Sequence, residues 1–475
     1  MANSQQALET TAEEAVVSLY ASQAKVYPRS VSGFFSRWRW LVIWATQLFF
    51  YGMPWLEWGQ RQALLFDLEA RRFFIFGLVL YPQDLIYLTA LLIISAMSLF
   101  LFTAVAGRLW CGYACPQTVY TEIFLWIERQ LEGDRAARIK LDAAPWSWRK
   151  FAKKGGKQAI WIAVALWTGF TFVGYFTPIR ELGAALGDFA LGPWESFWIL
   201  FYGFATYGNA GYMREQVCKY MCPYARFQSA MFDADTMIVT YDERRGEPRG
   251  SRSRKLGEDH ALGACVDCSL CVQVCPTGID IRKGLQYECI GCGACADVCD
   301  SVMDRMGYAK GLIRYSTQNG IVHGWNRRQM LKRILRPRVL IYNGILLLLG
   351  LSLLASLWLR DSFRVDVIRD RGVMSRLVEG GQVENVYRLQ IMNASEEPQG
   401  YRLHATGLAD LQLLTDAADA SGAIRVDGAA ARWISLRLRV PDGRLTPGSH
   451  PVVFEIDNMQ SGERVRERSV FLMSR

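Results

Sequence analysis

The sequence has little histidine and no recognisable nucleotide-binding motif. Its only histidines are His260, His323, His404 and His450, and none lies in a long apolar stretch. This excludes a haem held by two histidines inside a membrane segment. No G-x-G-x-x-G motif follows a predicted strand, so a dinucleotide or flavin domain is not expected.

Cysteine is absent from the last third of the chain, because all 12 cysteines lie before residue 300. Residues 1 to 36 lack a hydrophobic signal core. We therefore expect a cytoplasmic N-terminal segment and no cleaved targeting peptide. The net charge is +9, and the basic residues lie beside apolar stretches. This position is typical of cytoplasmic loops of a membrane protein, so nucleic-acid binding is not expected.

Eight of the cysteines form two copies of one pattern, C-x2-C-x2-C-x3-C, at an offset of 24 residues. This is the ligand run of bacterial two-cluster ferredoxins, in which the fourth cysteine of each run binds the other cluster. The pattern predicts one 4Fe-4S cluster on Cys265, Cys268, Cys271 and Cys299. It predicts a second cluster on Cys289, Cys292, Cys295 and Cys275.

Zinc and disulfides are the alternatives for these runs. Structural zinc usually takes its thiolates as two separated pairs. Disulfides need an oxidising compartment and do not explain the same run occurring twice. The second run departs slightly from the pattern, since Asp300 stands where a proline is expected.

The sequence is 51% apolar, with 16 tryptophans, which indicates a membrane portion. Crossing the hydrocarbon layer takes about 20 residues. We predict five spans, over 40 to 57, 85 to 107, 158 to 178, 194 to 213 and 339 to 359. The apolar stretch from Phe73 to Tyr81 is too short to cross and is predicted to be interfacial or re-entrant.

Basic residues predict the orientation of these spans. The loop from 108 to 157 is rich in lysine and arginine, whereas the loop from 179 to 193 has only Arg180. A second basic cluster, between Arg327 and Arg338, precedes the fifth span. Positive loops face the cytoplasm, so the N-terminus and the cysteine runs are predicted inside and residues after 360 outside.

Four further cysteines form a repeated C-x3-C-P motif after the second and fourth predicted spans, at Cys111, Cys115, Cys218 and Cys222. A spacing of four predicts that both sulfurs of a pair share one helix face. If the two helix ends meet, the thiolates form a soft-ligand site for Cu(I) or iron. A thiol-disulfide relay, or cysteine as a small apolar residue, are the other interpretations.

The last 110 or so residues contain short alternating stretches separated by turn residues, which predict about seven strands in an immunoglobulin-like sandwich. The predicted fold is thus a polytopic α-helical membrane protein with an inserted α+β two-cluster ferredoxin domain and a C-terminal all-β sandwich. The predicted parts are an N-terminal segment (1–36), a four-span membrane domain (37–230), the ferredoxin domain (231–325), a basic flank with the fifth span (326–360) and the sandwich (361–475).

Several local motifs resemble one known family. They include Tyr27-Pro28-Arg29, the stretch from Arg61 to Leu68, Tyr81-Pro82-Gln83-Asp84, the stretch from Gly107 to Thr118, and Trp126-Ile127-Glu128-Arg129. Together with the order of spans, cysteine motifs and sandwich, they are similar to the CcoG/FixG/RdxA family of cytochrome c oxidase accessory proteins. The similarity covers nearly the whole chain.

This resemblance implies a multi-pass protein of the bacterial inner membrane, with a periplasmic sandwich, that assists assembly of the cbb-type oxidase. It implies reduction of Cu(II) to Cu(I), the activity of a cupric reductase. Cys111, Cys115, Cys218 and Cys222 are the candidate copper or redox thiols for this reaction. Expected partners are membrane lipid, a cytoplasmic electron donor, and copper chaperones or oxidase assembly factors, but no nucleic acid. A quinol-oxidising respiratory subunit and a non-catalytic assembly scaffold are the alternative functions.

Overall fold

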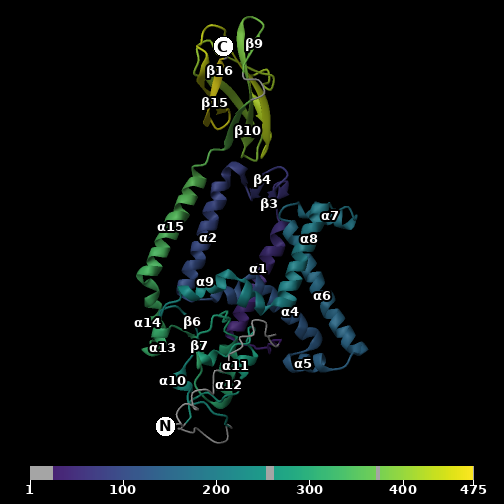
Figure 1. The fold of residues 1–475 in the computed structure, drawn as a ribbon, viewed down its shortest axis with the longest axis vertical. Coiled ribbons are helices and arrows are strands. Elements are labelled where there is room, and N and C mark those ends of the chain that lie inside the picture. The colour runs from purple at the N-terminus through teal and green to yellow at the C-terminus, as the bar shows by residue number, and fades with distance from the viewer. Residues whose placement is uncertain (1–24, 253–261, 371–374, 474–475) are drawn as a thin grey trace, which may run out of the picture.

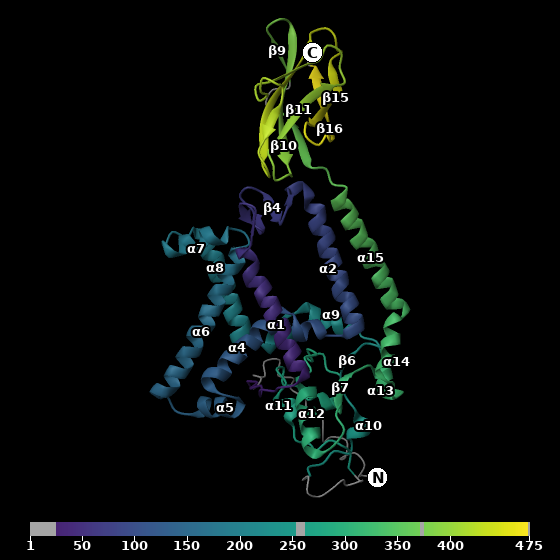
Figure 2. The same ribbon diagram turned by 180° about the vertical axis from the view of Figure 1, so that it is seen from behind.

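The computed structural model describes residues 25–252, 262–370 and 375–473. Two long helices, α2 (Leu85–Ala106) and α15 (Pro337–Trp358), run side by side, with α15 at the outer edge of the helical layer (Figure 1). A β-rich domain lies at one end of these helices and the cysteine-rich domain lies at the other (Figure 2). The two predicted extramembranous parts are therefore on opposite sides of the helical layer.

A helix overlaps each of the five predicted spans, and these helices are α1 (Phe34–Gly52), α2, α6 (Trp148–Val173), α8 (Pro193–Thr206) and α15; α1 and α6 each end five residues before the predicted end of the span. In the described part of the chain, two helices are long and apolar enough to cross a membrane, Pro82–Ala106 and Pro337–Trp358. Helix α8 has only 14 residues and continues as a π-helix over Tyr207–Met213. Helix α6 begins in the basic loop. Length and composition thus support two of the spans, and the five-span topology stays a prediction.

Shorter helices connect the long ones. They are α3 (Leu109–Tyr113), α4 (Pro116–Glu132), α5 (Arg135–Ala143), α7 (Ile179–Gly187) and α9 (Pro223–Met231). Helix α2 stops at Gly107, whose φ of +54° favours glycine. This stop lets the chain turn into α3 and the first C-x3-C-P motif.

The cysteine-rich domain is small and built around one strand pair. Strand β6 (Ile238–Tyr241) pairs antiparallel with β7 (Ile313–Ser316), and the two cysteine runs lie between them in sequence. Its helices are α10 (Glu243–Gly246), α11 (Leu270–Gln273) and α12 (Ala294–Met306). Helices α13 (Gln318–Val322) and α14 (Arg327–Lys332) lead on to α15.

The C-terminal domain is a sandwich of two antiparallel sheets, as predicted. One sheet holds β8 (Phe363–Arg369), β9 (Arg376–Val378), β10 (Gln382–Asn393), β12 (Gln412–Thr415) and β14 (Ala431–Pro441). The other holds β11 (Gln399–Thr406), β13 (Ile424–Val426), β15 (Gly448–Asn458) and β16 (Arg464–Met473). Alternate residues such as Tyr387, Leu389 and Ile391 point into a common core, because side chains alternate along a strand.

The segment from Phe73 to Tyr81 forms β-structure that packs on the sandwich, and its interfacial or re-entrant position stays a prediction. It forms most of a three-stranded sheet, β3 (Leu64–Asp67), β4 (Arg72–Ile75) and β5 (Leu78–Leu80), next to the short pair β1 (Glu57–Trp58) and β2 (Arg61–Gln62). Its apolar residues pack on Met392 of the sandwich. The Tyr81 hydroxyl donates to the Asn393 carbonyl at 2.8 Å.

One buried carboxylate joins the helices to the sandwich. Asp84 precedes α2 and accepts from Arg360 at 2.6 Å and from Arg364 at 3.3 Å. Both arginines follow α15 in the chain. The start of α2, the end of α15 and strand β8 thus meet at one side chain.

Candidate redox site

Two cavities in the cysteine-rich domain are each lined by four of the predicted ligands. The first is lined by Cys265, Cys268, Cys271 and Cys299, together with apolar residues of β7 and α12. The second is lined by Cys275, Cys289, Cys292 and Cys295, and Cys271 also reaches it. The fourth cysteine of each run thus faces the cavity of the other run. This is the arrangement expected for crossed ligation.

The thiols are held in apolar surroundings. Burial raises the pKa of Cys289 and of Cys299 to about 12, and that of Cys271 to about 11. Such thiols give up their protons only when a metal takes the proton's place. An all-sulfur donor set also suits the iron of 4Fe-4S clusters. The residues therefore fit two such clusters.

The two C-x3-C-P motifs span helix breaks, so the prediction that both sulfurs of a pair share one helix face is wrong. Cys111 lies in α3, but Cys115 lies beyond the end of that helix, with ψ at 128°. Cys218 lies in a π-helix and Cys222 follows it, with ψ at 110°. The residue before a proline avoids the helical region, because it would clash with the proline ring.

The two motifs nevertheless come together. Cys111 and Cys218 both pack against a buried cluster that contains Ile290 and Cys292 of the second cavity. Burial raises the pKa of Cys111 to about 12, and nearby Cys115 and Cys218 contribute to the rise. Within the residues that the structure describes, no three His, Cys, Asp or Glu side chains converge closely enough to hold a single metal ion.

A glycine allows the first motif to approach the second cavity. A Cβ atom on Gly112 would lie 2.8 Å from the Ile290 carbonyl oxygen, 2.9 Å from that of Gly291 and 3.0 Å from the Cys292 Cα. All three neighbours are backbone atoms of the loop that carries Cys289 and Cys292. Helix α3 therefore rests directly on this loop.

Arg108 ties the same loop to both motifs. Its guanidinium donates to the carbonyls of Tyr287, Cys289 and Ala225, the second of these at 3.4 Å. Ala225 lies in α9, just after the second motif. Arg108 is only 5% exposed, so its charge is sheltered beside the second cavity. A buried cation there favours the more negative, reduced form of a bound cluster.

A second buried cation lies near the same loop. Arg39 of α1 pairs with Glu122 of α4 at 3.2 Å and interacts electrostatically with Cys292. The Tyr315 hydroxyl donates to the Gly291 carbonyl and shares a side-chain hydrogen bond with Tyr113 of α3. The second cavity is thus held between α1, α3 and α4.

Asp297 fixes α1 onto the cysteine-rich domain. This residue lies in α12 between Cys295 and Cys299, and its carboxylate accepts from the backbone N–H groups of Phe35 at 3.1 Å and Ser36 at 2.7 Å. A carboxylate at a helix N-terminus satisfies free N–H groups and opposes the positive end of the helix dipole. A side chain from the cluster domain therefore caps the first helix.

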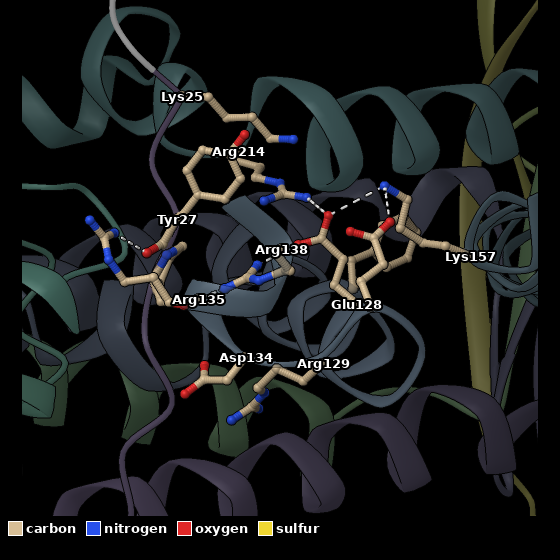
Figure 3. Close-up of polar contacts among 12 residues, drawn as sticks. Lys25, Tyr27, Glu128, Arg129, Asp134, Arg135, Arg138, Lys157 and Arg214 are labelled. Carbon is tan, nitrogen blue, oxygen red and sulfur yellow. Dashed lines mark hydrogen bonds and ion pairs between the residues drawn. The ribbon is translucent and has the colours of Figure 1, made fainter. Parts of the chain in front are cut away.

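A buried ion network supports the other side of α4 (Figure 3). Glu128 pairs with Arg138 of α5 at 2.7 Å, with Arg214 at 2.6 Å and with Lys157 of α6 at 3.6 Å. Burial raises the pKa of Glu128, but these cations outweigh burial and leave the pKa lowered. Arg138 also donates to the Pro28 carbonyl. The network therefore joins three helices to the segment before α1.

The sequence reasoning missed Arg39, Arg108, Asp297 and Tyr315 as site residues. Arg108 is one of the basic residues that predict the membrane orientation, and no prediction rests on Arg39. The available signal was that Arg108 lies next to a cysteine motif and Arg39 next to an apolar stretch. Asp297 is 262 residues from Phe35, and no local pattern indicates such a contact.

The fold and the paired cysteine cavities define a dicluster iron–sulfur electron-transfer protein. Residues 213–318 match the family described as "4Fe-4S dicluster domain", and residues 88–132 match a "4Fe-4S binding domain" family. Residues 353–474 match the "IG-like fold at C-terminal of FixG".

The chain belongs to the family of FixG, RdxA and RdxB. It is 36% identical to protein RdxB of Cereibacter sphaeroides over 97% of this chain and 99% of that protein. It is 38% identical to nitrogen fixation protein FixG of Rhizobium meliloti over 82% of this chain and 80% of that protein. A crystal structure of a FixG-related protein from Vibrio parahaemolyticus matches 24% of this chain and 97% of its own, at 23% identity and a TM-score of 0.21.

Proposed function

We propose that this protein is a cupric reductase of the bacterial inner membrane that assists assembly of a cbb-type cytochrome c oxidase. One 4Fe-4S cluster is held by Cys265, Cys268, Cys271 and Cys299, and the other by Cys275, Cys289, Cys292 and Cys295. Cu(II) is the substrate and is reduced near Cys111, Cys115, Cys218 and Cys222. Copper chaperones or oxidase assembly factors receive the product.

The observation that carries this proposal is the contact between the thiol motifs and the second cavity. Cys111 and Cys218 pack on the buried cluster that contains Cys292. Gly112 places the α3 backbone against the loop that carries this cysteine. An electron that leaves the second cluster thus has a short, packed route to the C-x3-C-P thiols.

The chemistry of the four thiols suits copper reduction. Bound clusters supply electrons one at a time, and each Cu(II) takes one electron to become Cu(I). Soft thiolate ligands favour Cu(I) over Cu(II). Burial raises the pKa of Cys218 to about 11, so this thiol keeps its proton until a metal displaces it.

The proposed topology has five spans, with the cysteine-rich domain in the cytoplasm and the sandwich in the periplasm. Exposed side chains such as Leu92 on α2 and Leu348 on α15 are apolar, at 61% and 66% exposure. Apolar faces of this length suit contact with lipid. The opposite positions of the two domains agree with an odd number of spans.

Anaerobic reduction of Cu(II) by the purified, dithionite-reduced protein tests the proposed function. We expect the quadruple variant with serine at Cys111, Cys115, Cys218 and Cys222 to lose Cu(I) production while its reduced clusters keep their spin-resonance signals. The serine variant of Cys268 alone is the comparison, because it changes a cluster signal without altering the four thiols. Wild-type rates in the quadruple variant would remove the four thiols from the reaction.

A further inference from the structure

A large cavity in the described part of the chain has no cysteine in its lining. It has a volume of about 1130 Å³ and lies between α1, α4 and α6. Its walls are mainly apolar and include four tryptophans, Trp40, Trp44, Trp126 and Trp167. Pockets for drug-sized ligands measure about 300–1,000 Å³. The space is therefore sufficient for a ring with an attached hydrocarbon chain.

One buried polar atom of this cavity has no partner. Gln47 of α1 lines the cavity, and its Oε1 is buried without a hydrogen-bond partner among the described residues. Nearby, the Tyr51 hydroxyl is 2.9 Å from Thr168 Oγ1 and 3.4 Å from the Tyr120 hydroxyl. An unpaired buried acceptor is costly, so a ligand hydroxyl that donates to Gln47 would remove an unfavourable feature.

The cavity is connected to the second cluster site through charged residues. Arg129 lines the cavity and lies 3.7 Å from Glu122, which pairs with Arg39 at 3.2 Å. Arg39 interacts in turn with Cys292. Only a few side chains of α1 and α4 thus separate the cavity from the proposed electron acceptor.

We propose that this cavity binds an isoprenoid quinol, which donates electrons to the clusters. The apolar walls suit the isoprenoid chain, and the acceptor on Gln47 suits a quinol hydroxyl. Oxidation of one quinol to quinone releases two electrons and two protons. Each 4Fe-4S cluster takes one electron, and the protons leave to water at the polar end of the cavity, near Arg129, Gln130 and Asp134.

The buried arginines support this direction of electron flow. Arg39 and Arg108 are both 5% exposed and flank the second cavity. Positive charge without competing solvent raises the reduction potential of a cluster. A quinol is a weak reductant, so a cluster that accepts its electrons needs such surroundings. The inference rests on the proposed function for the clusters, but it does not depend on copper being the final acceptor.

Cluster reduction by a soluble ubiquinol analogue tests the inference. The full-length protein is isolated anaerobically with oxidised clusters, mixed with the quinol and followed by spin resonance. We expect the wild type to develop the reduced-cluster signal. We expect Gln47→Leu to slow this reduction about tenfold, the factor for one lost hydrogen bond. We expect Ala163→Phe, which fills the cavity wall, to abolish it.

Ala355→Phe is the matched control, because Ala355 is exposed on α15 and far in sequence from the cavity. Full reduction by dithionite shows that each variant has intact clusters. No cluster signal with quinol in the wild type, or equal rates in all variants, would overturn the inference. So would a cavity that retains only phospholipid after purification. Addition of Cu(II) to dithionite-reduced wild type tests the cupric reaction separately, so each proposal can fail without the other.

Discussion

The contact between α3 and the cluster loop makes Gly112→Ala a sharp test of the electron route. The added Cβ would lie within 3.0 Å of three backbone atoms. Overpacking of this kind costs about 1–3 kcal/mol. Alanine returns up to about 1 kcal/mol, because it favours helix more than glycine does. We therefore expect a net loss of about 1–2 kcal/mol, concentrated at the α3 contact with the loop of Cys289 and Cys292.

The matched control is Gly155→Ala, in helix α6. A Cβ on Gly155 would meet nothing within 4 Å. The temperature at which the visible cluster absorbance is lost is measured under anaerobic conditions for both variants. We expect Gly112→Ala to lose absorbance about 2–4 °C or more below the wild type and to reduce Cu(II) more slowly. We expect Gly155→Ala to match or exceed the wild type.

The reasoning would be refuted if both variants lost their cluster absorbance at the same temperature and reduced Cu(II) at the same rate. Such a result would mean that α3 does not rest on the cluster loop. The main support for electron transfer from the second cluster to the C-x3-C-P thiols would then be lost.

Three further predictions concern buried carboxylates. Asp297→Asn should weaken the docking of α1 by about 1–2 kcal/mol. Proteolysis of the chain before Phe35 in the anaerobic protein should then be faster than in the wild type. An unchanged rate of proteolysis would contradict this prediction. Glu128→Gln leaves buried cations unpaired and should cost about 3–5 kcal/mol, seen as a lower unfolding temperature than for the exposed-site variant Glu181→Gln. Burial raises the pKa of Glu384, but Arg439 and Arg376 outweigh it and leave the pKa lowered. A carboxyl whose pKa is lower in the folded protein than in the unfolded chain stabilises the fold at pH values above the unfolded-state pKa. This stabilisation is lost as the pH falls and the carboxylate is protonated. Denaturation of the 361–475 fragment should therefore show a Glu384→Gln deficit that is largest at pH 7 and shrinks below the usual pKa of 4.5; a constant deficit would contradict it.

The repeated patterns of the sequence predicted much of the fold. The cysteine runs predicted which residues line each cavity, including the exchange of Cys275 and Cys299. Five alternating stretches of the C-terminal part, 386–392, 401–406, 432–440, 451–456 and 465–473, lie within β10, β11, β14, β15 and β16. Periodic patterns succeed here because ligand spacing and strand alternation are local properties.

The failures came from contacts between distant parts of the chain. The stretch from Phe73 to Tyr81 packs on the base of the sandwich, more than 300 residues later, a contact that no local pattern indicates. Spacing alone suggested one helix face for each cysteine pair, but the prolines that follow end the helical geometry. Arg108 and Asp297 act through partners that no local window contains.

Asp84 has a mechanical consequence for the whole chain. Arg360 and Arg364 both pair with this carboxylate, so the sandwich has an anchor at the start of α2 as well as its covalent link to α15. Two attachment points restrict rotation of the sandwich more than the single linker would. A partner that displaced the sandwich would therefore also exert force on α2. The other end of α2 is followed directly by α3, which contains Cys111.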